Sequence, residues 1–239
     1  MSGLMEYISK KIADADLVSK PFKFFEVKDF VPERCYSAFV SSLPALDLYK
    51  PLMHKSTLKN GRPTRFELPL SLEDCSADLG NVFLGSKVSI DVVEFLRGEQ
   101  FKSLLLSKFG SSVDVTPYPH LYKDFAGFDL PPHTDIVEKA ITFGWYLPRS
   151  DECKDSGLGL FVKNEDGFEE FRKIPYAPNV AFAFLRSNNS WHGATHHPNA
   201  PYERNSFFVT FYRKNHYRNG ALLVNDPNVS RKEIRIYEG

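Results

Sequence analysis

Two patterns of hydrophobic positions divide the chain near residue 112. Before that point apolar residues recur at helical spacing, and Leu4, Ile8 and Ile12 follow one another every four residues. After it, short β-branched and aromatic runs are separated by Pro, Gly, Asn and Asp, which is typical of strands joined by turns. The pattern therefore predicts a helix-rich first part and a β-rich second part.

A second helix is predicted from the apolar positions Val31, Cys35 and Phe39, which are again four residues apart. Asp29 is the predicted N-cap, and Pro32 is predicted near the first helical position, where its missing N–H costs nothing. We expect this helix to bury its apolar side against the rest of the protein.

A longer helical stretch is predicted over residues 88–109. Gly98 interrupts its apolar periodicity and Gly110 follows its end. We therefore expect one or two helices that hinge at Gly98 and stop at Gly110.

The β-rich part contains the runs VDVTPYPHLY, KAITFGWYL, GLGLFV, VAFAFL and NSFFVTFY, with no amphipathic helix between them. This favours an antiparallel sandwich or small barrel over a βαβ sheet, and a jelly roll is the natural candidate. The aromatic side chains on these runs, Trp145, Phe161, Phe182 and Phe184, are expected in the core. We expect a single domain, with a helix-rich support over residues 1–112, a β core over 113–214 and a C-terminal extension over 215–239.

Composition narrows the class of protein. The 239 residues carry 30 Lys and Arg against 30 Asp and Glu, so no basic field favours nucleic acid or an anionic membrane as a partner. No apolar run approaches the roughly 18 residues that span a membrane, and charges throughout the N-terminal segment argue against a signal peptide. A cytoplasmic protein is expected.

The three cysteines, Cys35, Cys75 and Cys153, are an odd number at wide spacing. They fit neither a disulfide framework nor a zinc ribbon, so reduced thiols are expected. Acidic neighbours disfavour a nucleophilic thiolate at Cys153.

The most specific chemical feature is the triplet His133-Thr-Asp135. Residues i and i+2 of an extended strand share a face, so the imidazole and the carboxylate can bind one metal ion. His192 appears 57 positions later, after the run VAFAFL. Two imidazoles and one carboxylate suit non-haem Fe(II) with three coordination positions left open, although zinc uses the same ligands. The alternative for His133 and Asp135 is an exposed turn pair.

Other histidines compete for these roles. His196 and His197 are rivals of His192, which is preferred because it directly follows Asn-Asn-Ser-Trp where a strand resumes. His120 is a rival first ligand, but prolines flank it and no carboxylate stands two residues after it.

Arg204 begins a strongly alternating strand. One of its faces carries Arg204, Ser206, Phe208, Thr210 and Tyr212. A guanidinium beside a hydroxyl is suited to hold a carboxylate, and a buried arginine requires an anion, which a bound dicarboxylate would supply. The alternative is an edge-strand arginine in water.

The order His133-x-Asp135, His192, Arg204-x-Ser206 resembles the Fe(II)/2-oxoglutarate-dependent oxygenase superfamily, whose fold is a double-stranded β-helix of jelly-roll type. Further stretches are similar to its prolyl-hydroxylase-like branch, and the resemblance covers about residues 118–213. Those stretches are Tyr122 with Gly127, then residues 140–147, 157–161 and 178–184, and Trp191 before His192.

The resemblance implies a hydroxylase that uses Fe(II), 2-oxoglutarate and O2 and releases succinate and CO2. The implied iron ligands are His133, Asp135 and His192. Arg204 and Ser206 would hold the C5 carboxylate of 2-oxoglutarate, and Tyr122 is a candidate for a further hydroxyl contact. The substrate would be a small molecule, a saccharide or a peptidyl side chain with an unactivated C–H bond.

Two features refine what the resemblance implies. Many prolyl hydroxylases have Gly-Gly-x-Thr where this chain has Ser156-Gly-Leu-Gly, which weakens the case for peptidyl-proline. Retention of Asp135 favours hydroxylation over halogenation, because halogenating relatives replace this carboxylate.

Two other functions remain open. Nucleic-acid demethylases of the same superfamily carry a second arginine after the distal histidine, but Arg213 is on the opposite strand face from Arg204, and the neutral charge also disfavours this function. The other alternative is a non-enzymatic, metal-binding jelly roll. No motif specifies the oligomeric state.

Overall fold

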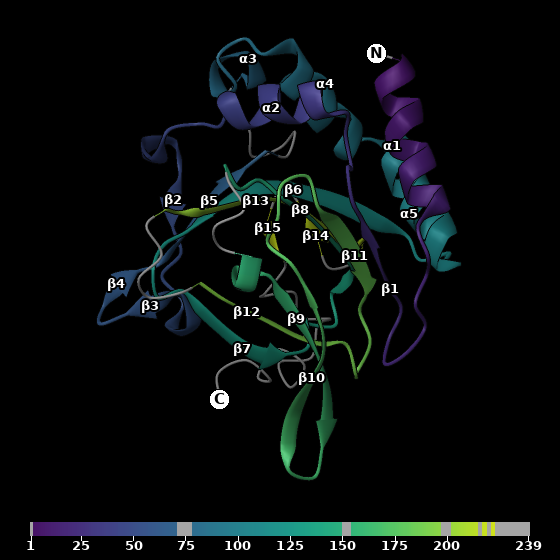
Figure 1. Ribbon diagram of the computed structural model, residues 1–239, viewed down its shortest axis with the longest axis vertical. Helices are drawn as coiled ribbons and strands as arrows, with labels where there is room; N and C mark the ends of the chain where they lie inside the picture. The colour runs from purple at the N-terminus through teal and green to yellow at the C-terminus, as the bar shows by residue number, and fades with distance from the viewer. Residues whose placement is uncertain are drawn as a thin grey trace.

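We describe residues 2–70, 78–149, 154–196, 202–214, 217–218 and 221–222 of the protein from a computed structural model. Two antiparallel sheets form its centre, and the helices lie together on one side (Figure 1). The α-helices are α1 (Ser2–Asp14), α2 (Glu33–Ser41), α3 (Leu79–Val82), α4 (Lys87–Leu96) and α5 (Glu99–Phe109). The 3₁₀ turns are η1 (Leu46–Leu48), η2 (Lys55–Thr57) and η3 (Lys154–Ser156).

The larger sheet has seven strands in the order β1-β11-β8-β13-β6-β5-β2. In that order they are β1 (Phe24–Val27), β11 (Ala181–Leu185), β8 (Lys139–Tyr146), β13 (Arg204–Arg213), β6 (Val115–Asp124), β5 (Arg65–Pro69) and β2 (Lys50–Pro51). The smaller sheet contains β10 (Gly167–Ile174), β9 (Leu158–Asn164), β12 (Trp191–Thr195) and β7 (Asp129–His133), in that order. Two short hairpins complete the set, β3 (Leu58–Lys59) with β4 (Arg62–Pro63) and β14 (Tyr217–Arg218) with β15 (Ala221–Leu222).

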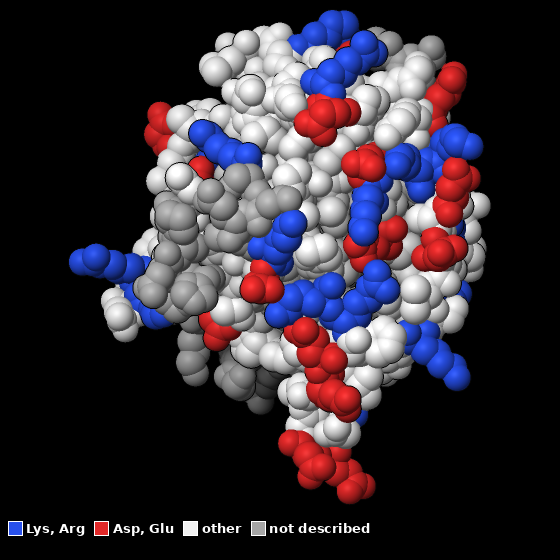
Figure 2. Space-filling model, in the orientation of Figure 1, with Lys and Arg blue, Asp and Glu red and all other residues white. Residues whose placement is uncertain are grey.

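These sheets confirm the predicted jelly roll. Apart from β9 and β10, which form one hairpin in the small sheet, strands β6 to β13 alternate between the two sheets in the manner of a double-stranded β-helix, and no α-helix lies between them in the described residues. The hairpin of β9 and β10 extends beyond the body of the fold (Figure 1). Acidic side chains gather at its tip, whereas basic and acidic groups are mixed over the rest of the face in Figure 2.

The helix predictions agree with the structure except at one N-terminus. Helix α5 begins after Gly98, and Gly110 ends it in the left-handed conformation at φ 61°, as the glycine positions predict. The N-cap of α2 is Pro32, which makes no side-chain cap, so the prediction of Asp29 as the cap was wrong. Asp29 lies earlier in the chain with φ 52°, and its left-handed backbone forms part of the turn before the helix.

Side chains alternate between the two faces of the large sheet, and each face packs into its own hydrophobic core. Outward-facing residues of the large sheet pack with the helices, where Trp145 lies 4.8 Å from the ring of Phe39 on α2 and Phe39 lies 6.2 Å from Phe207. Inward-facing residues such as Phe182 and Phe184 fill the space toward the small sheet. Phe161 differs from the core prediction, because it is only half-buried opposite Trp191 on the small sheet.

Within the described residues, no helix is both long enough and apolar enough to cross a bilayer.

Candidate active site

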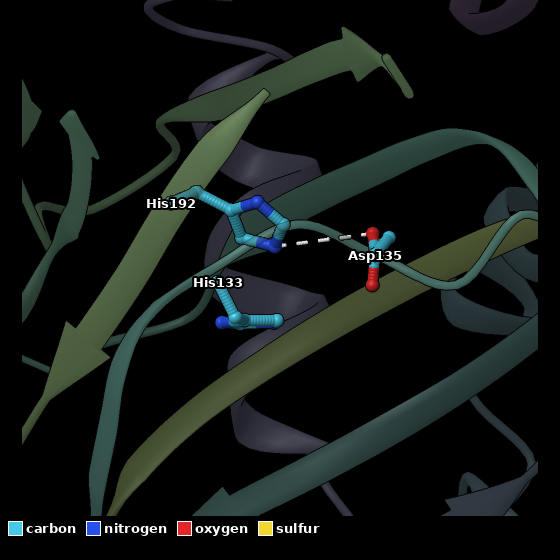
Figure 3. A group of neighbouring side chains, drawn as sticks. All are labelled: His133, Asp135 and His192. Carbon is cyan, nitrogen blue, oxygen red and sulfur yellow. Dashed lines mark ion pairs between the residues drawn. The ribbon is translucent and has the colours of Figure 1, made fainter. Parts of the chain in front are cut away.

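The two histidines of the predicted metal site face each other across neighbouring strands. His133 ends β7 and His192 lies in β12, and the strand register pairs them directly. Asp135 follows β7 by two residues. The ligand atoms of the three side chains lie within 4.8 Å of one another, and Figure 3 shows them converging from β7, β12 and the loop after β7. His192 Nε2 is 3.8 Å from Asp135 Oδ2.

Backbone carbonyls orient both imidazoles. His133 Nδ1–H donates to the carbonyl of Pro131 at 3.0 Å, and His192 Nδ1–H donates to the carbonyl of Ser190 at 2.9 Å. Because a carbonyl only accepts, each ring carries its proton on Nδ1 and has a lone pair on Nε2. A fixed Nδ1–H tautomer is the usual arrangement for a metal-ligating histidine.

Asp135 is held in place by two donors. Lys139 Nζ donates to Oδ1 at 2.6 Å and Thr142 Oγ1 donates to Oδ2 at 2.9 Å. Burial raises the pKa of Asp135, but the charges of Lys139 and the neighbouring histidines outweigh it, so the net pKa is well below its usual range. The group is a carboxylate at neutral pH.

Burial has the opposite effect on the histidines, because it disfavours their charged form. It lowers the pKa of His192 to about 4, with His133 adding to the decrease, and it also lowers the pKa of His133. The site therefore presents two neutral imidazoles and one anion at neutral pH, which is the protonation state that metal binding requires.

A cavity of about 80 Å³ opens onto these three side chains. Arg204 and Tyr122, which the sequence predicts as co-substrate contacts, line the same cavity. Ser206 is fully buried on the Arg204 face of β13. Its Oγ is the one buried side-chain polar atom without a hydrogen-bond partner among the described residues. Buried hydroxyls rarely lack a partner, so this atom is suited to a polar ligand.

Arg204 is not exposed to water, because its residue is 1% exposed. Its Nη1 donates to Asp124 Oδ2 at 2.6 Å, its Nε to the carbonyl of Ser156 at 2.7 Å and its Nη2 to the hydroxyl of Tyr146 at 3.2 Å. The edge-strand alternative is therefore wrong. The expectation that a bound dicarboxylate must supply the anion is also corrected, because Asp124 already supplies one.

Sequence reasoning missed Arg65 and Asp124. Arg65 Nε donates to Asp124 Oδ1 at 2.6 Å and Arg65 Nη2 to Oδ2 at 2.9 Å. The guanidinium carbon of Arg65 lies 4.3 Å from the ring centre of Tyr122 and 4.0 Å from that of Phe128. The residues meet because β5 and β13 both pair with β6, placing Arg65 and Arg204 opposite Asp124. No local motif signals this three-strand register.

The rival histidines have other partners. His120 lines the cavity, but its Nδ1 bonds to the carbonyl of Tyr118 and its ring stacks on Phe208, so it lies outside the triad. Burial lowers the pKa of His120 to about 3. His196 uses Nδ1 with Ser156 Oγ and Nε2 with the carbonyl of Tyr202.

The sequence predictions for His197, Cys75 and Cys153 fall outside the described residues, as does most of the predicted C-terminal extension over residues 215–239. Cys35 is a buried free thiol. Arg213, considered for a demethylase, donates to the carbonyl of Val137 at the other end of β13 from Arg204.

Comparison with known proteins identifies the fold. No family model and no curated protein matches the sequence. Among solved structures, a Pseudomonas putida prolyl-4-hydroxylase is similar with a TM-score of 0.54 and 14% identity over 88% of this chain and 100% of that one. A Trichoplax adhaerens prolyl hydroxylase, solved with a hypoxia inducible factor peptide fragment, has a TM-score of 0.54 and 12% identity over 89% and 90% of the two chains.

A third similar structure is a 2OG-Fe(II) oxygenase family oxidoreductase from Burkholderia pseudomallei, with a TM-score of 0.51 and 11% identity over 92% of this chain and 94% of that one. At these identities the likeness concerns the fold. The chain therefore has the double-stranded β-helix fold of the 2-oxoglutarate oxygenases, as the resemblance in its motifs predicts.

Proposed function

We propose that this protein is a mononuclear Fe(II)- and 2-oxoglutarate-dependent oxygenase that hydroxylates an unactivated C–H bond. The observation that carries the proposal is the convergence of His133, Asp135 and His192 within 4.8 Å in a cavity that Arg204 also lines. The fold shared with 2-oxoglutarate oxygenases supports it.

The residues of the site fit both Fe(II) and 2-oxoglutarate. Two imidazole nitrogens and one carboxylate oxygen on one side of a metal are the donor set of non-haem Fe(II) oxygenases, with three positions open to other ligands. For the co-substrate, Arg204 lines the cavity and donates to the hydroxyl of Tyr146, and the unpartnered hydroxyl of Ser206 lies on the same face of β13 as Arg204. Tyr122 is the further candidate contact.

When bound, Fe(II) and 2-oxoglutarate would supply O2 activation, with oxidative decarboxylation of the co-substrate to succinate and CO2. The protein's own contribution is positioning. Lys139 and Thr142 fix the carboxylate of Asp135, the backbone carbonyls fix the two imidazoles, and the apolar side chains of Leu130, Phe184 and Phe208 in the cavity wall exclude water from the metal.

The proposal is tested by O2-dependent formation of succinate from 2-oxoglutarate with Fe(II), which can be measured without the prime substrate as slow uncoupled turnover. We expect succinate above the level of Fe(II) alone, a loss of at least about a hundredfold in His133→Ala and Asp135→Ala, and no loss in His54→Ala, whose side chain is exposed. Tightly bound zinc without succinate in wild type would instead support a non-enzymatic metal-binding jelly roll.

The prime substrate is proposed as a small molecule, a saccharide or a peptidyl side chain. Support for a peptidyl substrate comes from the similar Trichoplax hydroxylase, which was solved with a peptide fragment. A substrate panel separates the classes, because the true substrate should raise succinate formation and gain one oxygen atom by mass spectrometry. Succinate that stays at the uncoupled level with all peptides would argue against the peptidyl class.

A further inference from the structure

Two arginines that line the cavity share one buried carboxylate behind them. Asp124 Oδ2 accepts a hydrogen bond from Arg65 Nη2 at 2.9 Å and another from Arg204 Nη1 at 2.6 Å. The side chains of Arg65, Asp124 and Arg204 are 12%, 0% and 1% exposed. The two guanidinium groups are therefore held close together with little water to screen them.

The charges of this trio do not cancel. Two guanidinium groups and one carboxylate sum to plus one, and like charges at this separation repel strongly in a poorly solvated site. Asp135 is the carboxylate in the cavity wall, and it is paired with Lys139 and belongs to the metal site. An anion that binds beside Arg65 and Arg204 would therefore gain a more favourable electrostatic energy than it would beside a neutral arginine–aspartate pair.

A second observation indicates that a polar ligand binds here. Ser206 Oγ is fully buried and lacks a partner, and it lies on the same face of β13 as Arg204. The strand register places Ser206 between Tyr146 and Tyr122, and the ring of Tyr122 is the one against which Arg65 packs. The unpartnered hydroxyl and the excess positive charge thus lie in the same part of the site.

We propose that Arg65 is a second co-substrate-binding residue, and that Arg65 and Arg204, with Asp124 between them, together bind the carboxylate of 2-oxoglutarate farthest from the metal. This inference rests on the proposed function. It assigns to β5, in the N-terminal part of the chain, a direct role in the oxygenase site. Asp124 sets the strength of binding, because it cancels one of the two positive charges.

The test measures binding by calorimetry to protein loaded with Mn(II), which replaces Fe(II) and prevents turnover. The probes are 2-oxoglutarate and 2-oxopentanoate, which has the same chain length but lacks the far carboxylate. We expect Arg65→Met to weaken 2-oxoglutarate binding about tenfold or more and to leave 2-oxopentanoate binding unchanged. Asp124→Asn should have the opposite effect and tighten 2-oxoglutarate binding several-fold, because the trio then carries two positive charges.

The opposite signs separate ligand binding from a structural role, which would weaken binding in both variants and for both probes. Arg172→Met is the matched control, since Arg172 pairs with Glu26 on β1 and should leave both affinities unchanged. The inference would be overturned if Arg65→Met kept the wild-type preference for 2-oxoglutarate over 2-oxopentanoate. It would also be overturned if Asp124→Asn bound 2-oxoglutarate more weakly than wild type. Wild type that binds neither probe would instead overturn the proposed function.

Discussion

Ser206 carries a fully buried hydroxyl on the same face of β13 as Arg204. Its Oγ has no partner, so removing it from the ligand-free protein removes a desolvated group and no hydrogen bond. We expect Ser206→Ala to leave the free energy of unfolding unchanged or raise it by up to about 1 kcal/mol, and to weaken 2-oxoglutarate binding several-fold. Thermal unfolding of the Mn(II) protein with and without 2-oxoglutarate measures both effects. Clear destabilisation of the ligand-free protein would show that the hydroxyl already has a partner.

His120 makes a prediction about pH. Burial, followed by the charge of Lys139, lowers its folded-state pKa from 6.5 to about 3. Between these values the unfolded chain binds a proton that the folded protein does not, so stability is full above pH 6.5 and falls as the pH decreases toward 3. In urea titrations of metal-free protein, wild type should lose about 2 kcal/mol more than His120→Gln between pH 7 and pH 5. Equal losses would mean that His120 is not buried as a neutral group.

At the scale of elements, a bulge in β7, opposite Gly193 of β12, positions the metal site. The register between β12 and β7 shifts between His192 and Ala194, where Gly193 of β12 opposes both Pro131 and Pro132 of β7. A Cβ on Gly193 would lie 2.7 Å from the carbonyl oxygen of Leu130, which is backbone that cannot easily move. The two strands that carry the histidines therefore approach closely only because this residue is glycine.

Gly193→Ala should push β12 away from β7 and separate His192 from His133. We expect destabilisation of about 1–3 kcal/mol together with weaker Mn(II) binding. Gly3→Ala on α1 is the control, because a Cβ there meets nothing within 4 Å. Urea unfolding and metal titration measure the two effects, and unchanged metal affinity in a destabilised Gly193→Ala would contradict the proposed link between the bulge and the site.

Sequence reasoning succeeded where a signal is local. Gly98 and Gly110 mark helix boundaries because their effect is on their own backbone, and the alternation from Arg204 onward fixes which side chains face the cavity. It failed where contacts depend on pairing between distant strands. Asp124 meets both arginines only because β6 lies between β5 and β13. One local prediction also failed, because the N-cap of α2 is Pro32 and not Asp29.

At the scale of the whole molecule, the helices and the large sheet share one aromatic core. Phe39 on α2 contacts Phe83, Trp145 and Phe207, and Arg65 on β5 contributes to the cavity. The N-terminal part is thus joined to the β core through packing and through the site itself.

Phe39→Ala should therefore destabilise the protein by about 3–5 kcal/mol, because it leaves a cavity between α2 and the sheet. The matched substitution Phe168→Ala, at a position 42% exposed on the outer hairpin, should cost far less. Urea unfolding compares the two. A similar loss for both variants would show that Phe39 is not a central residue of this core.

The most direct test of the whole account is the visible absorption spectrum after anaerobic addition of Fe(II) and 2-oxoglutarate. If His133, Asp135 and His192 bind iron and the co-substrate chelates it, wild type should develop a weak charge-transfer band that neither addition produces alone, and His133→Ala should not. The same blank spectrum for wild type and His133→Ala would contradict the account.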